Sequence, residues 1–368
     1  MNIAIIGFSN NARAIIEGVE VKFIENVFIK YVLTDFHEEN RIFNFIKHVV
    51  VSDYNKIISD ASIDTILELT DDENSYERIK YALVAKKNVI TSSTDVIAKH
   101  YVELAKLAIE NDVSLLIDST INMSTIVTKA IEHNIYGITR RVYAILDKRY
   151  SKVISRMMDD KIPYEKAKND PIYGLVDNKK QNINELAILA MLCFDSKIDV
   201  SKVYYKDLEG LDNEFLEVID ILGYRLRLES YASLHKDEGI CLVIEPVVHK
   251  SNDQRYYLDY ELGAMIRIDY DSLINTITTR SGGYENLGSI RSNLKSIMDG
   301  HKTKHAPKNE YNCYGNELIF SKYIIKANYL DPNIVDKKIG NIYITKAISG
   351  AKIKELSNKI TFYARIDW

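Results

Sequence analysis

Short apolar runs alternate with stretches of helical period over the first part of the chain, and this alternation constrains the fold more than any other feature. Such runs are typical of buried strands, and the stretches between them are typical of amphipathic helices. We expect strands at 2–6, 28–34, 65–69, 88–91 and 114–117, and helices at about 10–18, 75–85 and 101–111. A chain that alternates in this way folds into a doubly wound α/β sheet.

The pattern changes from about residue 128. Strands of alternating polarity, expected at 141–146, 224–233 and 240–248, are mixed with helices, which predicts an α+β domain. The predicted division is a first domain at 1–128 with a returning helix at 286–299, a second domain at 129–285, a polar linker at 300–316, and a third unit at 317–368. This last unit has a strand, helix, strand, helix, strand pattern.

The charges are nearly balanced, with 48 Lys and Arg residues against 52 Asp and Glu. This balance favours neither a nucleic-acid partner nor an acidic membrane surface. Cys193, Cys241 and Cys313 are far apart and form no CxxC pair, so we expect buried thiols. The histidines form no zinc-binding motif, so no metal is expected. The chain shows no signal peptide and no apolar run of membrane-spanning length, which predicts a cytoplasmic protein.

The turn after the first expected strand has the pattern of a dinucleotide-binding loop. In such a loop the first Gly makes a tight turn, the second lets the backbone approach the pyrophosphate, and the third permits close helix packing. Gly7 and Ala12 fit the first and third roles, while Ser9 stands at the second. The candidate cofactor-binding residues of this loop are Gly7, Phe8, Ser9, Asn10, Asn11 and Ala12.

Ser9 and Asp35 each allow two interpretations. The Ser9 side chain would crowd the phosphates, or its hydroxyl would donate a hydrogen bond to them at the positive end of the helix. Asp35, just after the second strand, could accept the hydroxyls of the adenosine ribose and so favour NAD over NADP. Alternatively, it is a solvated loop acid. The first domain is therefore predicted to be Rossmann-like and to bind NAD or NADP.

The stretch 184–211, NELAILAMLCFDSKIDVSKVYYKDLEGL, resembles the substrate-domain helix of the homoserine dehydrogenase family. The resemblance covers roughly residues 1–300 in order and spacing. It runs through TILELT at 65–70, the run at 85–98, RVYAIL at 141–146, LGYRLRLESYAS at 222–233, IEPVV at 244–248 and RSGG at 280–283. Residues 317–368 resemble a shortened ACT domain, the small amino-acid-sensing domain that ends many of these enzymes.

This resemblance implies a biosynthetic oxidoreductase that reduces aspartate semialdehyde to homoserine with NAD(P)H. It adds Thr70, Ser92, Gly282 and Gly283 to the expected cofactor site. It also implies a dimerising, substrate-binding second domain. We expect a homodimer through the sheet of that domain, because strands such as 240–248 are too apolar for one face to stand in water.

The family's catalytic groups fall on residues that this chain has replaced. The family's two lysines, which serve as proton source and as cation for the substrate carboxylate, fall on Thr94 and Glu185. The family's Asp that recognises the substrate amine falls on Gln181. Two loops that shape the family's pocket fall on 122–124 and 147–150. An acidic loop that contributes to amine binding is shortened here, and it leaves as unaligned candidates Asp170 and Asp177.

The replacement at Glu185 reverses a charge. Exchanging Lys for Glu about 4 Å from a substrate carboxylate replaces an attraction of about 4 kcal/mol by a repulsion of similar size, at an effective dielectric of about 20. Glu185 therefore indicates either a different ligand, such as a cationic one, or an acid on a solvated helix face with no ligand. Lys148 and Arg149 could supply replacement cations, or they are exposed turn residues.

Two functions from different classes remain open. The first is an NAD(P)-linked oxidoreductase of the homoserine dehydrogenase type, acting on an amino-acid-like small molecule. The second is a catalytically degenerate homologue that serves as a ligand-binding or regulatory dimeric subunit. The whole-chain resemblance supports the first, and the replaced residues support the second.

Overall fold

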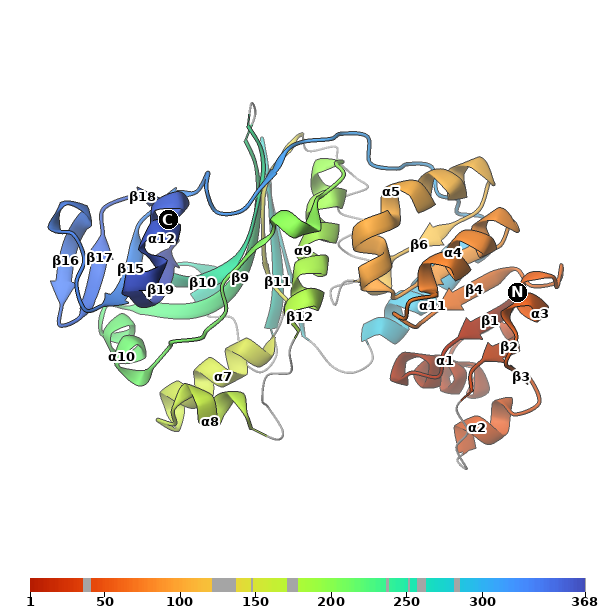
Figure 1. The fold of residues 1–368 in the computed structure, drawn as a ribbon. Coiled ribbons are helices and arrows are strands. Elements are labelled where there is room, and N and C mark those ends of the chain that lie inside the picture. Colours follow the sequence, from red (N-terminus) through yellow and green to blue (C-terminus); the bar gives the residue numbers. More distant parts are fainter. Residues whose placement is uncertain are drawn as a thin grey trace. The chain divides into compact units, whose positions relative to one another are not determined.

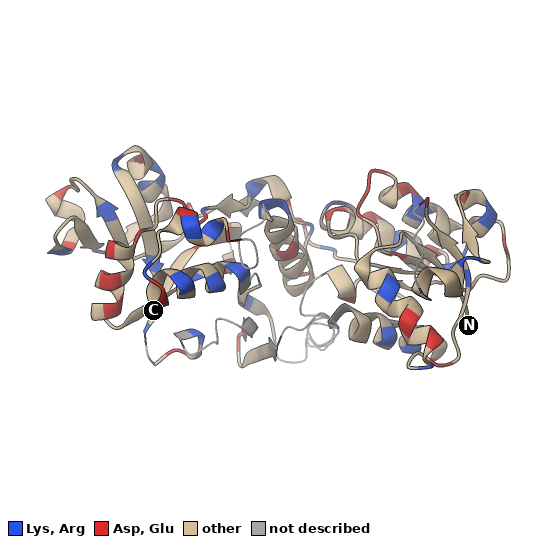
Figure 2. Cartoon of the chain, turned by 90° about the horizontal axis from the view of Figure 1, so that it is seen from below, with Lys and Arg blue, Asp and Glu red and all other residues tan. Residues whose placement is uncertain are grey.

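The structure is a computed structural model that describes residues 1–35, 41–120, 137–146, 148–170, 178–235, 238–250, 252–256, 263–280 and 285–367. The chain divides into two compact units, which are Met1–His133 with Gly282–Lys308 and Asn134–Ser281 with Asn309–Trp368 (Figure 1). Basic and acidic residues are interspersed on the elements of both units (Figure 2), in keeping with the balance of 48 against 52. A search of the described residues finds no helix with the length and apolar character of a membrane span.

The first unit is built on a parallel sheet of six strands in the order β3-β2-β1-β4-β5-β6. Its strands are β1 (Asn2–Ile6), β2 (Phe28–Leu33), β3 (Val50–Val51), β4 (Thr65–Glu68), β5 (Asn88–Thr91) and β6 (Leu115–Leu116). Its helices are α1 (Asn10–Glu20), α2 (Arg41–Ile46), α3 (Tyr54–Ile58), α4 (Ser75–Val84), α5 (Thr94–Glu110) and α11 (Glu285–Met298). The prediction of a doubly wound, Rossmann-like sheet is confirmed.

In the core of the first unit, β1 is buried on both faces, as is typical of parallel strands between two layers of helices. α1 turns its apolar stripe to the sheet, and α11 returns from far along the chain to the same core. The fully buried members of this core include Ile3, Ile5, Ala12, Ile15, Ile16, Ile290 and Leu294. The strand order reverses between β1 and β4. In open α/β sheets, the crevice at the carboxyl ends of the strands at such a reversal is where ligands bind.

The second unit is built on a mixed sheet with the strand order β12-β11-β7-β9-β10-β19-β15-β17-β16. These strands are β7 (Thr139–Ile145), β9 (Tyr224–His235), β10 (Gly239–Lys250), β11 (Gly263–Tyr270), β12 (Ile274–Arg280), β15 (Tyr323–Ala327), β16 (Val335–Ile339), β17 (Ile342–Thr345) and β19 (Ile360–Ile366). The helices are α7 (Lys148–Asp159), α8 (Tyr164–Lys168), α9 (Lys179–Phe194), α10 (Asn213–Ile221) and α12 (Gly350–Leu356). α9 contacts β7, β9 and β10.

β10 is the strand around which the second unit is assembled. One edge pairs along its whole length with β9, antiparallel. The other edge pairs in parallel with three short segments, which are β13 (Cys313–Tyr314), β8 (Tyr204–Tyr205) and the end of β19. Every residue of β10 except Lys250 is also buried within a single chain. The reason given above for a homodimer, an apolar face of 240–248 left in water, is wrong. The homodimer itself stays a prediction.

The C-terminal strands also differ from the expected pattern. In place of the first expected helix, β15 is followed by a short 3₁₀ turn, η5 (Pro332–Ile334), and by the β16–β17 hairpin. Asp331 and Pro332 start the turn, because the Asp331 side chain accepts the Asn333 N–H and Pro suits the first helical position. Gly340, with φ of +61°, closes the hairpin. The division into three domains stays a prediction.

Cys193 and Cys241 are buried, as predicted, while Cys313 is half-buried, and all three thiols are free. Burial raises the pKa of the Cys241 thiol to about 12. Such a thiol stays protonated near neutral pH and is unreactive, because the thiolate is the nucleophile.

Candidate functional site

The turn between β1 and α1 lies at the carboxyl end of the parallel sheet, next to the strand-order reversal. Gly7 has φ of +91°, and a Cβ added to it would lie 2.5 Å from Cγ2 of Thr70. Its N–H donates to the carbonyl of Leu33 over 2.9 Å. Both the backbone conformation and the close approach of Thr70 therefore require glycine here. Ala12 is fully buried, which suits the small residue that close packing of α1 demands.

Ser9 is the N-cap of α1. Its Oγ accepts a hydrogen bond from the Ala12 N–H over 3.4 Å, so the hydroxyl oxygen is directed at the helix end. The hydroxyl proton is still available to an anion. The neighbouring Phe8 ring lies edge-on to Phe43 with centroids 5.9 Å apart, and the Arg13 guanidinium lies 4.6 Å above it. Phe8 thus packs against protein groups at the base of the turn.

The other expected cofactor residues follow neighbouring strands of the same sheet. Asp35 is exposed just beyond β2, Thr70 follows β4, and Ser92 follows β5. Because the strands are parallel, these residues share the carboxyl edge with the turn after β1. Asn10 and Asn11 are the first two residues of α1. Gly282 and Gly283 lie outside the described residues.

A buried ion pair at this edge was not singled out from the sequence. Glu68, the last residue of β4, is fully buried, and Arg78 from α4 donates to its carboxylate from Nε over 2.8 Å and from Nη2 over 3.2 Å. Nη2 of Arg78 also donates to Oγ1 of Thr70 over 2.7 Å. The same nitrogen reaches the carboxylate of Asp72 at 2.7 Å. The Thr70 hydroxyl bonds Glu68, and it lies 2.9 Å from Oγ of Ser75.

The signal for this pair was present in the motif TILELT, where one acid stands inside an apolar strand. A buried carboxylate needs a cation or several donors. Burial raises the pKa of Glu68, although the hydrogen bonds from Arg78 and Thr70 oppose that shift. The network extends to the next strand, because Ser93 Oγ donates to the carbonyl of Thr70. The Tyr54 hydroxyl donates to the carbonyl of Arg78 over 2.6 Å.

α9 carries two of the replaced family positions in the second unit. The helix ends at Asp195, which has the left-handed φ of 50°. Glu185 is 1% exposed, so its interpretation as an acid on a solvated face is wrong. Gln181 lies one turn earlier, and its Nε2 donates to Glu185 Oε1 over 3.0 Å. An amide and a carboxylate thus bond each other where the family has an Asp and a Lys.

Thr94, at the family's other lysine position, is the first residue of α5 in the first unit. Its hydroxyl is 3.4 Å from two carbonyl oxygens, those of Ser92 and Thr120, to which it donates. A hydroxyl with an ordinary pKa is a poor proton source near neutral pH. The structure therefore offers no general acid at this position.

The alternative cations begin α7 rather than a turn. Arg149 is half-buried, and the Lys148 side chain lies outside the described residues. The next residue, Tyr150, shares a hydrogen bond of 2.7 Å between its hydroxyl and that of Tyr205. Asp170 forms an ion pair with Arg156. Asp147, Asp177 and the loop at 122–124 are not among the described residues.

The second unit also contains a cluster of buried charges on β9, β10 and β19. Glu229 and Glu245 stand opposite each other on neighbouring strands, a like-charge pair that repels unless cations intervene. Arg365 supplies one cation, with Nε 2.7 Å from Glu245 and Nη2 3.4 Å from Glu229. Arg255 supplies another, with Nη1 2.8 Å from Glu229. Burial raises the pKa of both glutamates, although the arginines oppose the shift.

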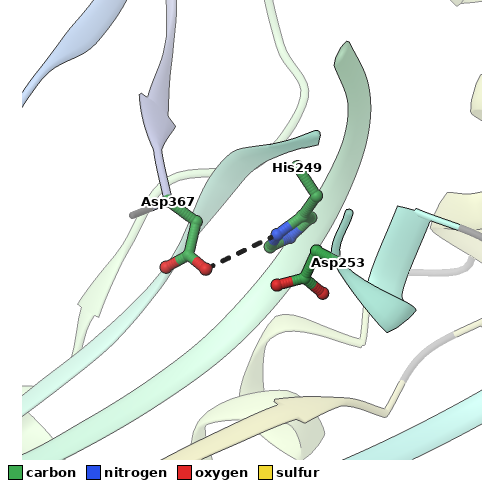
Figure 3. Close-up of side chains that lie close together, drawn as sticks. All are labelled: His249, Asp253 and Asp367. Carbon is green, nitrogen blue, oxygen red and sulfur yellow. Dashed lines mark ion pairs between the residues drawn. The ribbon is translucent and has the colours of Figure 1, made fainter. Parts of the chain in front are cut away.

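His249 lies beside this cluster and is 1% exposed. Its Nδ1 faces Asp367 at 3.8 Å (Figure 3), and its Nε2 faces Glu229 at 3.5 Å. Neither ring nitrogen makes a hydrogen bond within the described part of the chain. Burial and the nearby arginines hold the pKa of His249 well below its usual value, so the ring is neutral.

His249, Asp253 and Asp367 together offer three potential metal ligands, whose atoms lie within 4.8 Å of one another (Figure 3). However, Nη2 of Arg255 lies 2.7 Å from Asp253 Oδ2 and also bonds Asp367. A metal ion would have to displace a guanidinium that already neutralises both carboxylates. The donor set therefore fits an internal ion cluster better than a metal centre.

Comparisons with known proteins agree with this architecture. No protein-family model matches the chain. In sequence it is 22% identical over 359 residues to the homoserine dehydrogenase of Bacillus subtilis (strain 168), covering 90% of this chain and 81% of that protein. The chain is a homologue of homoserine dehydrogenase.

Two solved structures show the same fold as this homologue over its full length. The homoserine dehydrogenase of S. aureus at pH 7.0 has a TM-score of 0.79 at 17% identity, covering 100% of this chain and 99% of that one. The homoserine dehydrogenase of Thiobacillus denitrificans has a TM-score of 0.84 at 14% identity, covering 100% and 98%. At such identities the homologue shares the fold, and its own residues decide which chemistry it keeps.

Proposed function

We propose that the chain is an NAD(P)-linked oxidoreductase of the homoserine dehydrogenase type. Its substrate would be an amino-acid-like molecule of the homoserine and aspartate semialdehyde class. The observation that carries the proposal is the Gly7 turn, placed at the strand-order reversal in a chain that resembles homoserine dehydrogenase throughout. The positive φ and the missing Cβ at Gly7 fit a loop that lets a pyrophosphate approach the helix end.

The residues proposed to hold the dinucleotide have separate tasks. The start of α1, capped by Ser9, would face the pyrophosphate with the positive end of the helix dipole. Asp35 would accept the ribose hydroxyls, which favours NAD over NADP. When bound, the nicotinamide would supply or accept the hydride. Thr70 and Ser92 would flank it from the loops after β4 and β5.

A second candidate function rests on the Gln181–Glu185 hydrogen bond. Glu185 is buried and satisfied by its own helix neighbour, while Thr94 donates to backbone carbonyls. Neither arrangement serves a substrate carboxylate or a developing alkoxide. These observations favour a catalytically degenerate homologue that binds a ligand and acts as a regulatory subunit.

We also propose a cytoplasmic homodimer with a role in amino-acid biosynthesis and an ACT-like C-terminal unit at 317–368. Support for a partner surface now comes from another part of the second unit. Large apolar side chains lie exposed at the end of the sheet where β7 and β12 begin, by 54% at Ile138, 40% at Leu273 and 56% at Ile274. Apolar side chains gathered in this way favour association.

A titration followed by a rate measurement tests these proposals. Fluorescence of NADH and NADPH on binding should show saturable association, and a nucleotide at a hundred times its Kd should stabilise the fold by about 2.7 kcal/mol. Because of the reversed charge at Glu185, we expect homoserine turnover below about 1 per second, the low end of ordinary enzymes. A chain that binds neither dinucleotide would contradict the oxidoreductase. Binding without turnover of any amino-acid-like substrate would establish the second candidate.

A further inference from the structure

We propose that Arg78 is a positioning residue for the dinucleotide, because it holds Thr70 against the Gly7 turn and ties the loops after β4 and β5 together. This inference rests on the proposed dinucleotide binding. Arg78 itself would not touch the cofactor. Its side chain is 12% exposed, and its guanidinium is directed at Glu68, Thr70 and Asp72.

The first step of the argument is the contact between Thr70 and Gly7. The methyl group of Thr70 occupies the space where a Cβ of residue 7 would stand, only 2.5 Å away. The turn and the loop after β4 are thus in direct contact across the strand-order reversal. Any rotation of the Thr70 side chain would open or close this contact, and the backbone at Gly7 would follow.

The second step is the set of bonds that prevents this rotation. The Thr70 hydroxyl donates to Glu68 and accepts from Arg78, and it lies 2.9 Å from Ser75 Oγ. The Thr70 N–H also donates to Glu68 over 3.2 Å. A hydroxyl with partners on three sides has one rotamer available. Arg78 supplies the only charge-assisted donor to this hydroxyl among the described residues.

The third step is the link to β5. Ser93 Oγ donates to the Thr70 carbonyl, and the N–H of Asp95 donates to Asp71 Oδ2 over 3.4 Å. The start of α5, where Ser92 and Thr94 stand, is therefore fixed to the same loop. One buried ion pair is thus linked through Thr70 to the Gly7 turn and to the loops after β4 and β5. Groups that bind a ligand are effective only when neighbouring hydrogen bonds hold them in place.

The test is a double-mutant cycle on NADH and NADPH affinity in the full chain. Thr70→Val keeps the methyl group at Gly7 but removes the hydroxyl, and Arg78→Met keeps the length of the side chain but removes the donors. We expect Arg78→Met to raise Kd about tenfold and Thr70→Val about threefold to tenfold. If Arg78 acts through Thr70, the double variant should bind no more weakly than Arg78→Met alone.

Two control variants separate positioning from general stability. Tyr54→Phe removes the hydrogen bond to the Arg78 carbonyl and leaves the guanidinium intact, so it should lower the unfolding midpoint but leave Kd unchanged. Lys80→Met removes a cation of the same helix, 3.4 Å from Glu103 on the surface, and should change neither. Additive effects of Arg78→Met and Thr70→Val on Kd would overturn the inference. Unchanged Kd in Thr70→Val would overturn it too, even if Arg78→Met does not fold. Failure of wild type to bind either nucleotide would instead contradict the proposed function beneath it.

Discussion

The turn after β1 and the first turns of α9 differ in how far their polar groups are used within the protein. At the turn, Gly7 has a positive φ and no Cβ, and Ser9 caps the N-terminus of α1. On α9, Gln181 and Glu185 bond each other, and the charge is buried with its own donor. The first unit therefore keeps a turn of the kind proposed to receive a dinucleotide, whereas α9 uses its carboxylate in a hydrogen bond within the chain.

The largest effect should come from removing a cation inside the second unit. Arg365→Met would leave Glu229 and Glu245 facing each other in a buried site with one cation fewer. Breaking a buried ion pair by removing one partner costs about 3–5 kcal/mol, to be read from urea unfolding. The matched control is Lys322→Met, which breaks an exposed pair with Asp336 and should cost at most about 1 kcal/mol. An equal loss of unfolding free energy in the two variants would show that the buried cluster stabilises the fold no more than an exposed ion pair does.

The next effect tests whether the substrate half can be returned to ligand binding. Restoring Thr94→Lys, Gln181→Asp and Glu185→Lys together should raise kcat/KM for homoserine by about a hundredfold, the lower range for a recovered proton donor. The triple variant should exceed the best single change, since residues that act as a unit are non-additive. Steady-state rates with NAD and NADP measure this. Wild-type turnover of about 1 per second or more would show instead that other residues perform the chemistry, and Lys148 and Arg149 would be the first to test.

A glycine pair sharpens the contrast within the first unit. Gly7→Ala places an alanine in the left-handed backbone region and its Cβ against Thr70. The strain should cost at least about 1–2 kcal/mol of stability. The variant should no longer bind the dinucleotide. Gly288 lies on α11, and no atom of the described residues stands within 4 Å of a carbon added there. Gly288→Ala should stabilise the fold by up to about 1 kcal/mol, because alanine is the better helix former. Thermal unfolding and nucleotide titration of both variants give the comparison.

The sequence predicted the first unit better than the second, for a physical reason. A parallel strand buried on both faces appears in the sequence as an apolar run, and a positive φ requires a glycine. For these reasons β1, β4 and the Gly7 turn were predicted at the right positions. The partners of Glu68 and Glu245 left none, because their arginines come from other elements and bond them only in the folded chain. β8 and β13 were missed for another reason, since two-residue strands carry no periodicity.

A pH effect should appear in the second unit. His249 is neutral when folded because its pKa lies well below 6.5, whereas in the unfolded chain it titrates near its usual value. The stability from this group is present above about pH 6.5 and is lost below it at about 1.4 kcal/mol per pH unit. Glu229 and Glu245 contribute a pH dependence of the opposite sign. It cancels when the free energy of unfolding of His249→Gln is subtracted from that of wild type. The stability difference between wild type and variant should therefore shrink by about 1.4 kcal/mol between pH 7.5 and 5.5. A difference that grows as the pH falls would mean that His249 is charged in the folded cluster, and a constant difference would mean that folding leaves its pKa unchanged.

The smallest effect concerns Ser9. Ser9→Gly removes the N-cap hydroxyl and should cost only a few tenths of a kcal/mol in stability, since glycine is tolerated at that position. If the side chain crowds the pyrophosphate, the same change should tighten NAD(P) binding. Unchanged affinity would favour the other role of the hydroxyl, a donor to the phosphates.

The way β10 is completed also determines when the chain can finish folding during its own synthesis. β8 precedes β10 along the chain and can cover the middle of its edge at once, but Glu245 and its partner Arg365 are 120 positions apart. At about 5–20 residues per second, a ribosome needs roughly ten seconds to make that stretch. Until β19 has been made, part of the β10 edge and the buried Glu245 lack the partners that β19 provides. An open edge of this kind is a site for wrong pairing with other chains, so the nascent protein is exposed to aggregation in the interval between the synthesis of β10 and that of β19.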